Sequence, residues 1–380
     1  MSEPLPRRNF LTRVSLAFAS ALASPIISFS NSIQSSKSSA KKMNPIIKIR
    51  ALGFQWETLD PFLFCVHHED KFPKGNEVMG PVTSLQGRHL GDDFIIKDGF
   101  RMYHGKSVPG FPGHPHRGFE TITVVRQGIV DHADSMGAAG RYGDGDVQWM
   151  TAGKGVQHSE MFPLISTEKE NPMELFQIWL NLPKKNKMVE PHFKMLWRDL
   201  IPNFIHTDGH NKKTTVEVIA GKIDKTIAPT PPPNSWAADE KNEVAVWNIK
   251  MEAGAQWTLP IASEGINRTI YFYEGESLLL NETSIPKYNA VELMPNAEVV
   301  LHSGDKETSI LLLQGRPIDE PVIQYGPFVM NTKEEINQAF EDYHQTQFGG
   351  WPWPKYDQVH ERNKSRFAKH ADGKIETKES

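Results

Sequence analysis

Cysteine is almost absent from this chain of 380 residues, since Cys65 is the single cysteine. One thiol cannot form a disulfide within the chain, and it cannot supply the several thiolates of the cysteine-rich metal sites. The sequence therefore excludes a disulfide scaffold and a thiolate-rich site. Stability has to come from a buried core, which a chain of this length can form.

Long apolar runs and basic clusters are also missing. After residue 30 no stretch is long and apolar enough to cross a bilayer, and no basic stripe is present. Lys and Arg number 42 against 46 Asp and Glu, which gives a net charge of -4. This balance argues against a nucleic-acid partner. We expect a monomer of one large or two medium domains, with no stable membrane span after signal cleavage.

The first thirty residues have the layout of an export signal. Arg7 and Arg8 precede Asn-Phe-Leu and an apolar stretch, so residues 1–30 look like a twin-arginine signal. The sequence Ala-Leu-Ala at residues 21–23 offers a cleavage site, and Ser-Phe-Ser at residues 28–30 competes with it. We predict an exported, periplasmic protein. The alternative is an uncleaved N-terminal anchor.

A serine- and lysine-rich stretch follows the signal. Residues 31–45 read as a flexible linker because they carry too little apolar surface to fold. Met43 is a second candidate start, and translation from it would give a cytoplasmic form. The lack of disulfides fits a chain that folds in the cytoplasm before export, as a twin-arginine signal implies.

The body of the chain has the pattern of antiparallel β-structure. The 28 glycines and 27 prolines separate short strand-like runs in two series, over residues 100–183 and 216–314. We predict an all-β fold of two similar barrels, joined near residues 188–197. The predicted domains are residues 46–187 and 188–330.

The pattern changes near the C-terminus. Asn331 as N-cap, Glu334 three residues on and Gly349 as a stop predict an amphipathic helix over residues 331–349. Its apolar face is formed by Ile336, Ala339, Phe340 and Tyr343. The remaining polar tail, residues 350–380, is expected to be loosely held or disordered.

Two short motifs carry candidate metal ligands. In "GHPHRGFETI", His114 and His116 are two residues apart, so on a strand they face the same side. Such a pair is weak evidence alone, but His158 and Glu160 repeat the spacing in "TAGKGVQHSEMF". Three imidazoles and one carboxylate suit Fe²⁺, and also Ni, Mn, Co, Cu or Zn. The alternative is a charged barrel rim with satisfied hydrogen bonds.

Other polar residues give weaker signals. Adjacent His67 and His68 face opposite sides of a strand, so at most one could reach the same cation, and surface or loop contacts are favoured. His132 and Asp134 are interpreted as part of a solvated hairpin. Glu120 is either a fifth ligand or a residue that orients a histidine, and the second interpretation is favoured.

The sequence resembles the pirin family of bicupins. The resemblance rests on "HPHRGFETITVV", "GDVQWMTAGKGVQHSEM", "LFQIWLNLP" and "YGPFVMNTKEEINQAFEDY", and it extends over residues 62–348. It implies a non-haem iron site in the N-terminal barrel with the ligands His114, His116, His158 and Glu160. It also implies that Glu120 does not coordinate. The C-terminal barrel, with His302 as the single histidine of residues 216–314, is expected to be metal-free.

Through that resemblance, we expect an iron-dependent dioxygenase of quercetinase type that acts on a flavonol or a similar small aromatic substrate. Glu160 is placed to accept the proton of the substrate hydroxyl while remaining at the metal. Candidate apolar walls for the substrate are Phe111, Phe119, Met150 and Phe162, with ordinary core packing as the alternative for each. The alternative function is a non-catalytic, metal-dependent redox-sensing or protein-binding module.

Overall fold

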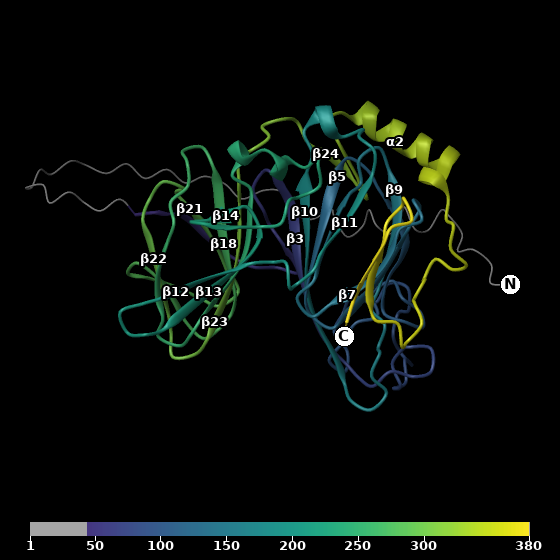
Figure 1. Cartoon of the computed structure of the whole chain (residues 1–380), viewed down its shortest axis with the longest axis horizontal. Coiled ribbons are helices and arrows are strands. Elements are labelled where there is room, and N and C mark those ends of the chain that lie inside the picture. The colour runs from purple at the N-terminus through teal and green to yellow at the C-terminus, as the bar shows by residue number, and fades with distance from the viewer. Residues whose placement is uncertain (1–43, 380) are drawn as a thin grey trace, which may run out of the picture.

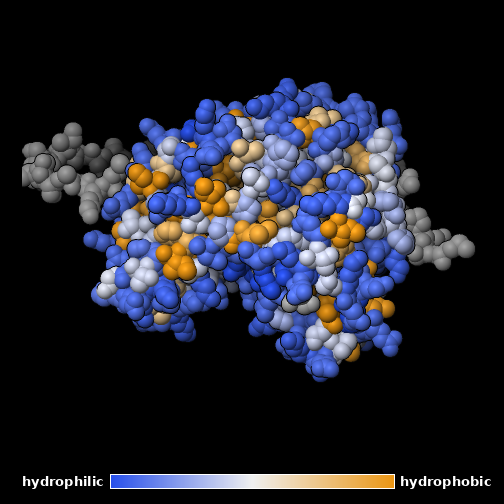
Figure 2. Space-filling view, in the orientation of Figure 1, coloured by the Kyte–Doolittle hydropathy of each residue, from blue (hydrophilic) through white to orange (hydrophobic). Residues whose placement is uncertain are grey.

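The computed structural model describes residues 44–379 and confirms a bicupin, with two antiparallel β-barrels and one α-helix (Figure 1). The predicted signal and nearly all of the predicted linker lie outside the described residues. Within residues 44–379, no helix has the length and apolar character that a membrane span requires. On the face in Figure 2 the barrels form two lobes, and apolar residues lie in small separate groups among hydrophilic ones.

The N-terminal barrel consists of two six-stranded sheets. The first sheet has the strand order β11 (His192–Leu196), β8 (Val147–Thr151), β5 (Phe119–Gln127), β10 (Asn171–Asn181), β3 (Phe62–Phe72) and β2 (Gln55–Trp56). The second has the order β27 (Ile375–Lys378), β26 (Arg366–Lys369), β7 (Ala139–Gly143), β6 (Ile129–Asp134), β9 (Val156–Met161) and β4 (Gly110–His116).

The C-terminal barrel has one large and one small sheet. The seven-stranded sheet has the order β1 (Ile46–Ala51), β21 (Asn289–Leu293), β18 (Asn267–Glu274), β23 (Thr308–Gly315), β16 (Ala245–Met251), β13 (Lys213–Ala220) and β12 (Asn203–Thr207). The four-stranded sheet has the order β17 (Gln256–Leu259), β22 (Val299–Ser303), β19 (Leu278–Leu280) and β20 (Thr283–Ile285).

Short elements complete the fold. Two hairpins pair β14 (Lys222–Ile223) with β15 (Thr226–Ile227), and β24 (Ile323–Tyr325) with β25 (Phe328–Met330). The 3₁₀ turns are η1 (Lys184–Asn186), η2 (Trp236–Ala238), η3 (Glu240–Asn242) and η4 (Gln347–Gly349).

The two barrels share a core because the sheets that face each other are buried on both faces. In β5, residues 119–125 are all buried, which is the pattern of a strand covered on both sides. Ile122 and Val124 of this strand belong to one apolar cluster with Tyr271 of β18 and Leu311 of β23. The alternating residues of β5, such as Thr123, face the interior of the N-terminal barrel.

Three strands cross the predicted domain boundaries. Strand β1 pairs with β21 of the C-terminal barrel although it lies at the start of the predicted N-terminal domain. Strand β11 pairs with β8 of the N-terminal barrel although it lies beyond residue 188. Strand β26, from the chain's end, pairs with β7 of the N-terminal barrel. Each covers the edge of a sheet that would otherwise expose unpaired backbone groups.

The expectation of a loosely held tail is wrong. Strand β26 runs along the N-terminal barrel beside β7 (Figure 1). Arg366 of this strand contacts both carboxylate oxygens of buried Asp146 at 2.7 Å. Arg141 of β7 forms a buried pair with Asp131 and donates further to backbone carbonyls of residues 360–364. The tail is polar because it satisfies buried charges, which residue composition alone does not reveal.

The predicted helix is present as α2 (Lys333–Thr346), and its predicted apolar residues are confirmed: Ile336 and Ala339 are buried, and Phe340 and Tyr343 pack beside them. The cap differs by one position, because Thr332 and Glu335 form the capping box instead of Asn331 and Glu334. Helix α2 ends before Gly349, at a left-handed Gln347.

Candidate metal centre

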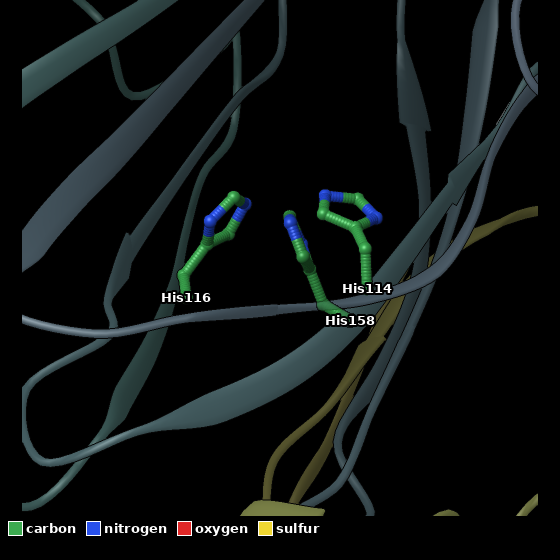
Figure 3. Close-up of side chains that lie close together, drawn as sticks. All are labelled: His114, His116 and His158. Atoms are coloured by element: carbon green, nitrogen blue, oxygen red, sulfur yellow. The ribbon is translucent and has the colours of Figure 1, made fainter. Parts of the chain in front are cut away.

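Strands β4 and β9 bring the three predicted histidine ligands together. In the antiparallel register His114 lies opposite His158, and His116 follows on the same face of β4. The ring centroids are 4.5 Å apart for His114 and His158, 4.8 Å for His114 and His116, and 4.9 Å for His116 and His158. One nitrogen from each residue lies within 4.8 Å of the others, and Figure 3 shows the rings converging.

The hydrogen bonding of these histidines fits a bound cation. Both ring nitrogens of His158 and Nδ1 of His116 are buried and have no hydrogen-bond partner. Nδ1 of His114 donates to the Pro112 carbonyl oxygen at 2.9 Å, which leaves Nε2 as its free lone pair. A buried polar atom without a partner costs about 1–3 kcal/mol, and a metal ion would remove that cost.

The protonation of the three residues also suits metal binding. Burial is the main cause that lowers their pKa values, to about 4 for His114 and well below the ordinary value for His116 and His158. All three are therefore neutral near pH 7 and present lone pairs. The set fits a divalent transition metal, and imidazole donors alone do not distinguish iron from nickel, copper or zinc.

Glu160 lies beside this group, but its carboxylate is directed to other partners. Its Oε2 is 3.9 Å from Nε2 of His158. Thr123 Oγ1 donates to Oε1 at 2.7 Å, and Gln177 Nε2 donates to Oε2 at 2.8 Å. Burial raises the pKa of Glu160, and these hydrogen bonds oppose the rise. The structure thus brings together three of the four predicted ligands, and coordination by Glu160 stays a prediction.

Glu120 does not contact the histidines and does not orient one of them. It lies on the face of β5 opposite Thr123, toward the other barrel. Its carboxylate accepts from Thr151 Oγ1 at 2.6 Å and from Ser235 Oγ at 2.5 Å. Burial raises its pKa to about 7. The predicted role of orienting a ligand is corrected, because strand alternation directs this side chain between the barrels.

His132 and Asp134 are buried inside the barrel, so the prediction of a solvated hairpin is wrong. His132 donates from Nε2 to Asp134 Oδ2 at 3.1 Å and accepts at Nδ1 from Gln148 at 3.2 Å. Its ring centroid is 5.5 Å from that of His158. These residues lie in β6, which pairs with β9 and so faces the same interior. The signal in the sequence was their spacing of two residues, which places both side chains on one face of a strand.

His67 and His68 do face opposite sides of β3, as their adjacency predicts, but neither is a loop residue. His67 donates to Glu174 at 3.1 Å and stacks on Phe176 with ring centroids 4.6 Å apart. His68 is buried and contacts the hydroxyl of Tyr103 at 2.9 Å. The expected surface contacts are therefore replaced by buried ones, because β3 lies inside its sheet between β10 and β2.

The four predicted apolar walls divide into two groups. Phe111 is partly exposed with its centroid 6.3 Å from that of His114, and Phe119 packs on His116 at 5.0 Å. Met150 and Phe162 are fully buried members of apolar clusters. Sequence proximity to the ligands therefore identifies two residues that border the histidines, although Phe119 is also a fully buried core residue, and two further core residues.

C-terminal residues brace the strands that carry the histidines. Arg117, next to His116, donates to Asp342 of α2 at 2.7 Å and lies over the ring of Phe348. Gln157, next to His158, donates to the Gln347 carbonyl oxygen at 2.6 Å. These contacts fix both ligand strands from outside the barrel.

Within residues 44–379, the histidine group in the N-terminal barrel is the single cluster whose donor atoms converge in this way. His302 lies on β22 of the other barrel, opposite Gln256 and Leu279.

Comparisons with known proteins agree with this architecture. Residues 48–180 match the family model described as Pirin, and residues 246–349 match the Pirin C-terminal cupin domain. A pirin-like protein from Solanum lycopersicum is 37% identical over 255 residues, covering 66% of this chain and 80% of that protein. Pirin from Homo sapiens is 35% identical over 272 residues, covering 68% of this chain and 83% of that protein.

A solved structure has a similar fold. The quercetin 2,3-dioxygenase from Acinetobacter baumannii superposes with a TM-score of 0.63 at 28% identity, covering 81% of this chain and 99% of that one. The two family domains occur here in order, one in each barrel. The chain belongs to the pirin family.

Proposed function

We propose that this protein is an iron-dependent dioxygenase of quercetinase type that opens a flavonol or a similar hydroxylated aromatic compound. The observation that carries the proposal is the group of three neutral histidines in the N-terminal barrel, of which His116 and His158 are buried with unpartnered nitrogens and His114 is partly exposed. The likeness to a quercetin 2,3-dioxygenase over 81% of the chain supports it. Fe²⁺ is the proposed metal, with Ni, Mn, Co, Cu or Zn as alternatives.

In this proposal His114, His116, His158 and Glu160 hold the metal. When bound, the ion supplies Lewis acidity and one-electron chemistry toward dioxygen. Partly exposed Phe111 borders His114 and provides apolar surface for an aromatic ring, and buried Phe119 packs on His116. Such walls exclude water and orient the substrate hydroxyl.

Glu160 is the proposed acceptor of the substrate hydroxyl proton. Thr123 and Gln177 hold its two oxygens in fixed positions, so little reorganisation is needed when a proton arrives. Burial raises its pKa and thereby favours the protonated form that results from the transfer.

One experiment tests both the site and the reaction. The purified protein is loaded anaerobically with Fe²⁺, its metal content is measured, and loss of flavonol absorbance is followed after oxygen is admitted. His114→Ala is compared with His302→Ala, a control in the other barrel. We expect the wild type and His302→Ala to bind iron and consume the flavonol, and His114→Ala to lose at least tenfold in activity.

The outcomes separate the alternatives. Iron binding without flavonol consumption would contradict the quercetinase reaction and favour a non-catalytic redox-sensing or protein-binding module. No iron binding by the wild type would contradict the site itself.

We also propose a periplasmic location, supported by Arg7, Arg8 and the apolar stretch after them. Translation from Met43 would instead give a cytoplasmic form. We propose a monomer, and the charge balance supports the absence of a nucleic-acid partner.

A further inference from the structure

A row of partly exposed rings leads from the surface to His114. Phe54 is 45% exposed, and its centroid is 6.3 Å from that of Phe94. Phe94 is in turn 6.3 Å from Phe111, which lies 6.3 Å from His114. Exposed aromatic side chains that adjoin one another often mark a ligand-binding surface. This row ends at the metal centre.

His68 also adjoins Phe111. The ring centroids of His68 and Phe111 are 6.0 Å apart, and those of His68 and Phe54 are also 6.0 Å apart. The imidazoles of His68 and His114 are thus both neighbours of the Phe111 ring. A planar ligand that lies along the aromatic row can approach both of them.

A chain of buried hydrogen bonds fixes His68 from behind. Arg101 donates to both oxygens of Asp70, from Nε at 3.0 Å and from Nη2 at 2.9 Å. The hydroxyl of Tyr103 donates to Oδ2 of Asp70 at 2.5 Å. Nδ1 of His68 lies 2.9 Å from that hydroxyl oxygen.

This chain determines which nitrogen of His68 carries the proton. Burial raises the pKa of Asp70, and the two charge-assisted bonds from Arg101 oppose the rise by favouring the ionised form, in which the carboxylate can only accept. Tyr103 uses its single proton for Asp70, and its oxygen must then accept from Nδ1–H of His68. Burial is the main cause that lowers the pKa of His68, so the ring is neutral near pH 7. Nε2 is left as an acceptor, and it has no hydrogen-bond partner among residues 44–379.

We propose that Nε2 of His68 accepts a hydrogen bond from a hydroxyl group on an outer ring of the aromatic substrate, and that it thereby selects hydroxylated over unsubstituted rings. The inference rests on the proposed function, because it places the substrate between His68 and the metal centre. A site with a fixed acceptor discriminates against analogues that lack the donor. No proton is transferred in this contact.

The test compares two flavonols that share the 3-hydroxyl group. Quercetin carries hydroxyls on its outer rings, and 3-hydroxyflavone carries none there. Dissociation constants for both are measured anaerobically on the Fe²⁺-loaded protein by fluorescence quenching. We expect wild type to bind quercetin about tenfold more tightly than 3-hydroxyflavone, since one buried hydrogen bond to an otherwise unpaired acceptor has about this effect.

Two substitutions at neighbouring positions isolate the acceptor. His68→Phe should reduce the preference for quercetin to about one. His67→Phe, the matched control on the opposite face of β3, should retain the wild-type preference. Tyr103→Phe removes the acceptor of Nδ1–H, so it should lower the preference while leaving the His68 ring in place. If His68→Phe does not fold, Tyr103→Phe tests the same hydrogen bond.

The results also distinguish this inference from the proposed function. Equal binding of the two flavonols by wild type, no binding of either, or a preference that persists in His68→Phe and Tyr103→Phe would each overturn the role of His68. Selective binding that depends on His68, without consumption of quercetin under oxygen, would support the acceptor and refute the dioxygenase reaction.

Discussion

The substitution Glu120→Gln tests whether this buried carboxyl belongs to the barrel interface instead of the metal centre. Glutamine keeps the shape of the side chain and can still bond to Thr151 and Ser235. Only the ionisation is removed. The variant should therefore change how stability depends on pH and leave the metal content unchanged.

The magnitude follows from the two pKa values. Glu120 has a pKa of about 7 in the folded chain against the ordinary value of 4.5. Because the folded-state pKa is raised, the stabilising contribution is fully present below pH 4.5 and is lost as pH rises through 7. The difference corresponds to about 3 kcal/mol of unfolding free energy. As the pH rises from 4.5 to 8, the unfolding free energy of Glu120→Gln should increase relative to that of the wild type by about that amount.

Urea unfolding at several pH values measures this quantity, and taking the difference between variant and wild type cancels the titration of shared groups. Metal content is measured on the same samples. Glu160→Gln is the matched comparison, since we expect it to lower iron retention while Glu120→Gln does not. A difference in unfolding free energy that stays constant from pH 4.5 to pH 8, or loss of metal from Glu120→Gln, would refute the assignment of Glu120 to the interface.

Two further predictions concern the ends of the chain. Arg366→Met leaves the buried carboxylate of Asp146 without its cationic partner, so we expect a loss of about 3–5 kcal/mol in unfolding free energy. Lys378→Met breaks a more exposed pair with Asp199 and should cost less than about 1 kcal/mol; equal losses in the two variants would contradict the structural role of the tail. At the other end, replacing Arg7 and Arg8 by Lys should reduce export, as measured by fractionation of cells, and unchanged export would refute the twin-arginine signal.

The sequence predicts those parts of the molecule that depend on local spacing. His114, His116 and His158 were identified because residues two apart share a face of a strand, and the apolar positions of α2 followed from helical periodicity. The sequence assigns Glu120 the wrong neighbours. The alternation of side chains along a strand shows which residues share a face of the sheet, but it does not show whether the barrel interior or the other barrel covers that face. His132 and Asp134 have the same spacing as the ligands, and only the pairing of β6 with β9 shows that they are buried.

The sequence did not predict which distant strands pair with each other. Nothing in residues 46–51 or 366–369 indicates that each strand joins the barrel at the other end of the chain. The polar character of the tail was informative only together with Asp131, Arg141 and Asp146, whose charges it satisfies. Such partners lie more than two hundred residues away in the sequence, as the pair Arg366 and Asp146 illustrates with a separation of 220.

The exchange of the two chain ends has a consequence for the order in which the protein can be completed. Strand β1 is made before every other strand of the C-terminal barrel, yet its partner β21 begins at Asn289, so β1 stays unpaired until the intervening chain has been made. The barrel that carries the histidines receives β26 from residues 366–369, which are made after every strand of the C-terminal barrel. The N-terminal barrel cannot be completed before β26 has been made, whereas the last strand of the C-terminal barrel, β23, ends at Gly315. A cut between the barrels would leave each without at least one of its own strands. The two barrels therefore depend on each other's segments of the chain, and the barrel that carries the histidines has its full set of strands only after β26 has been made.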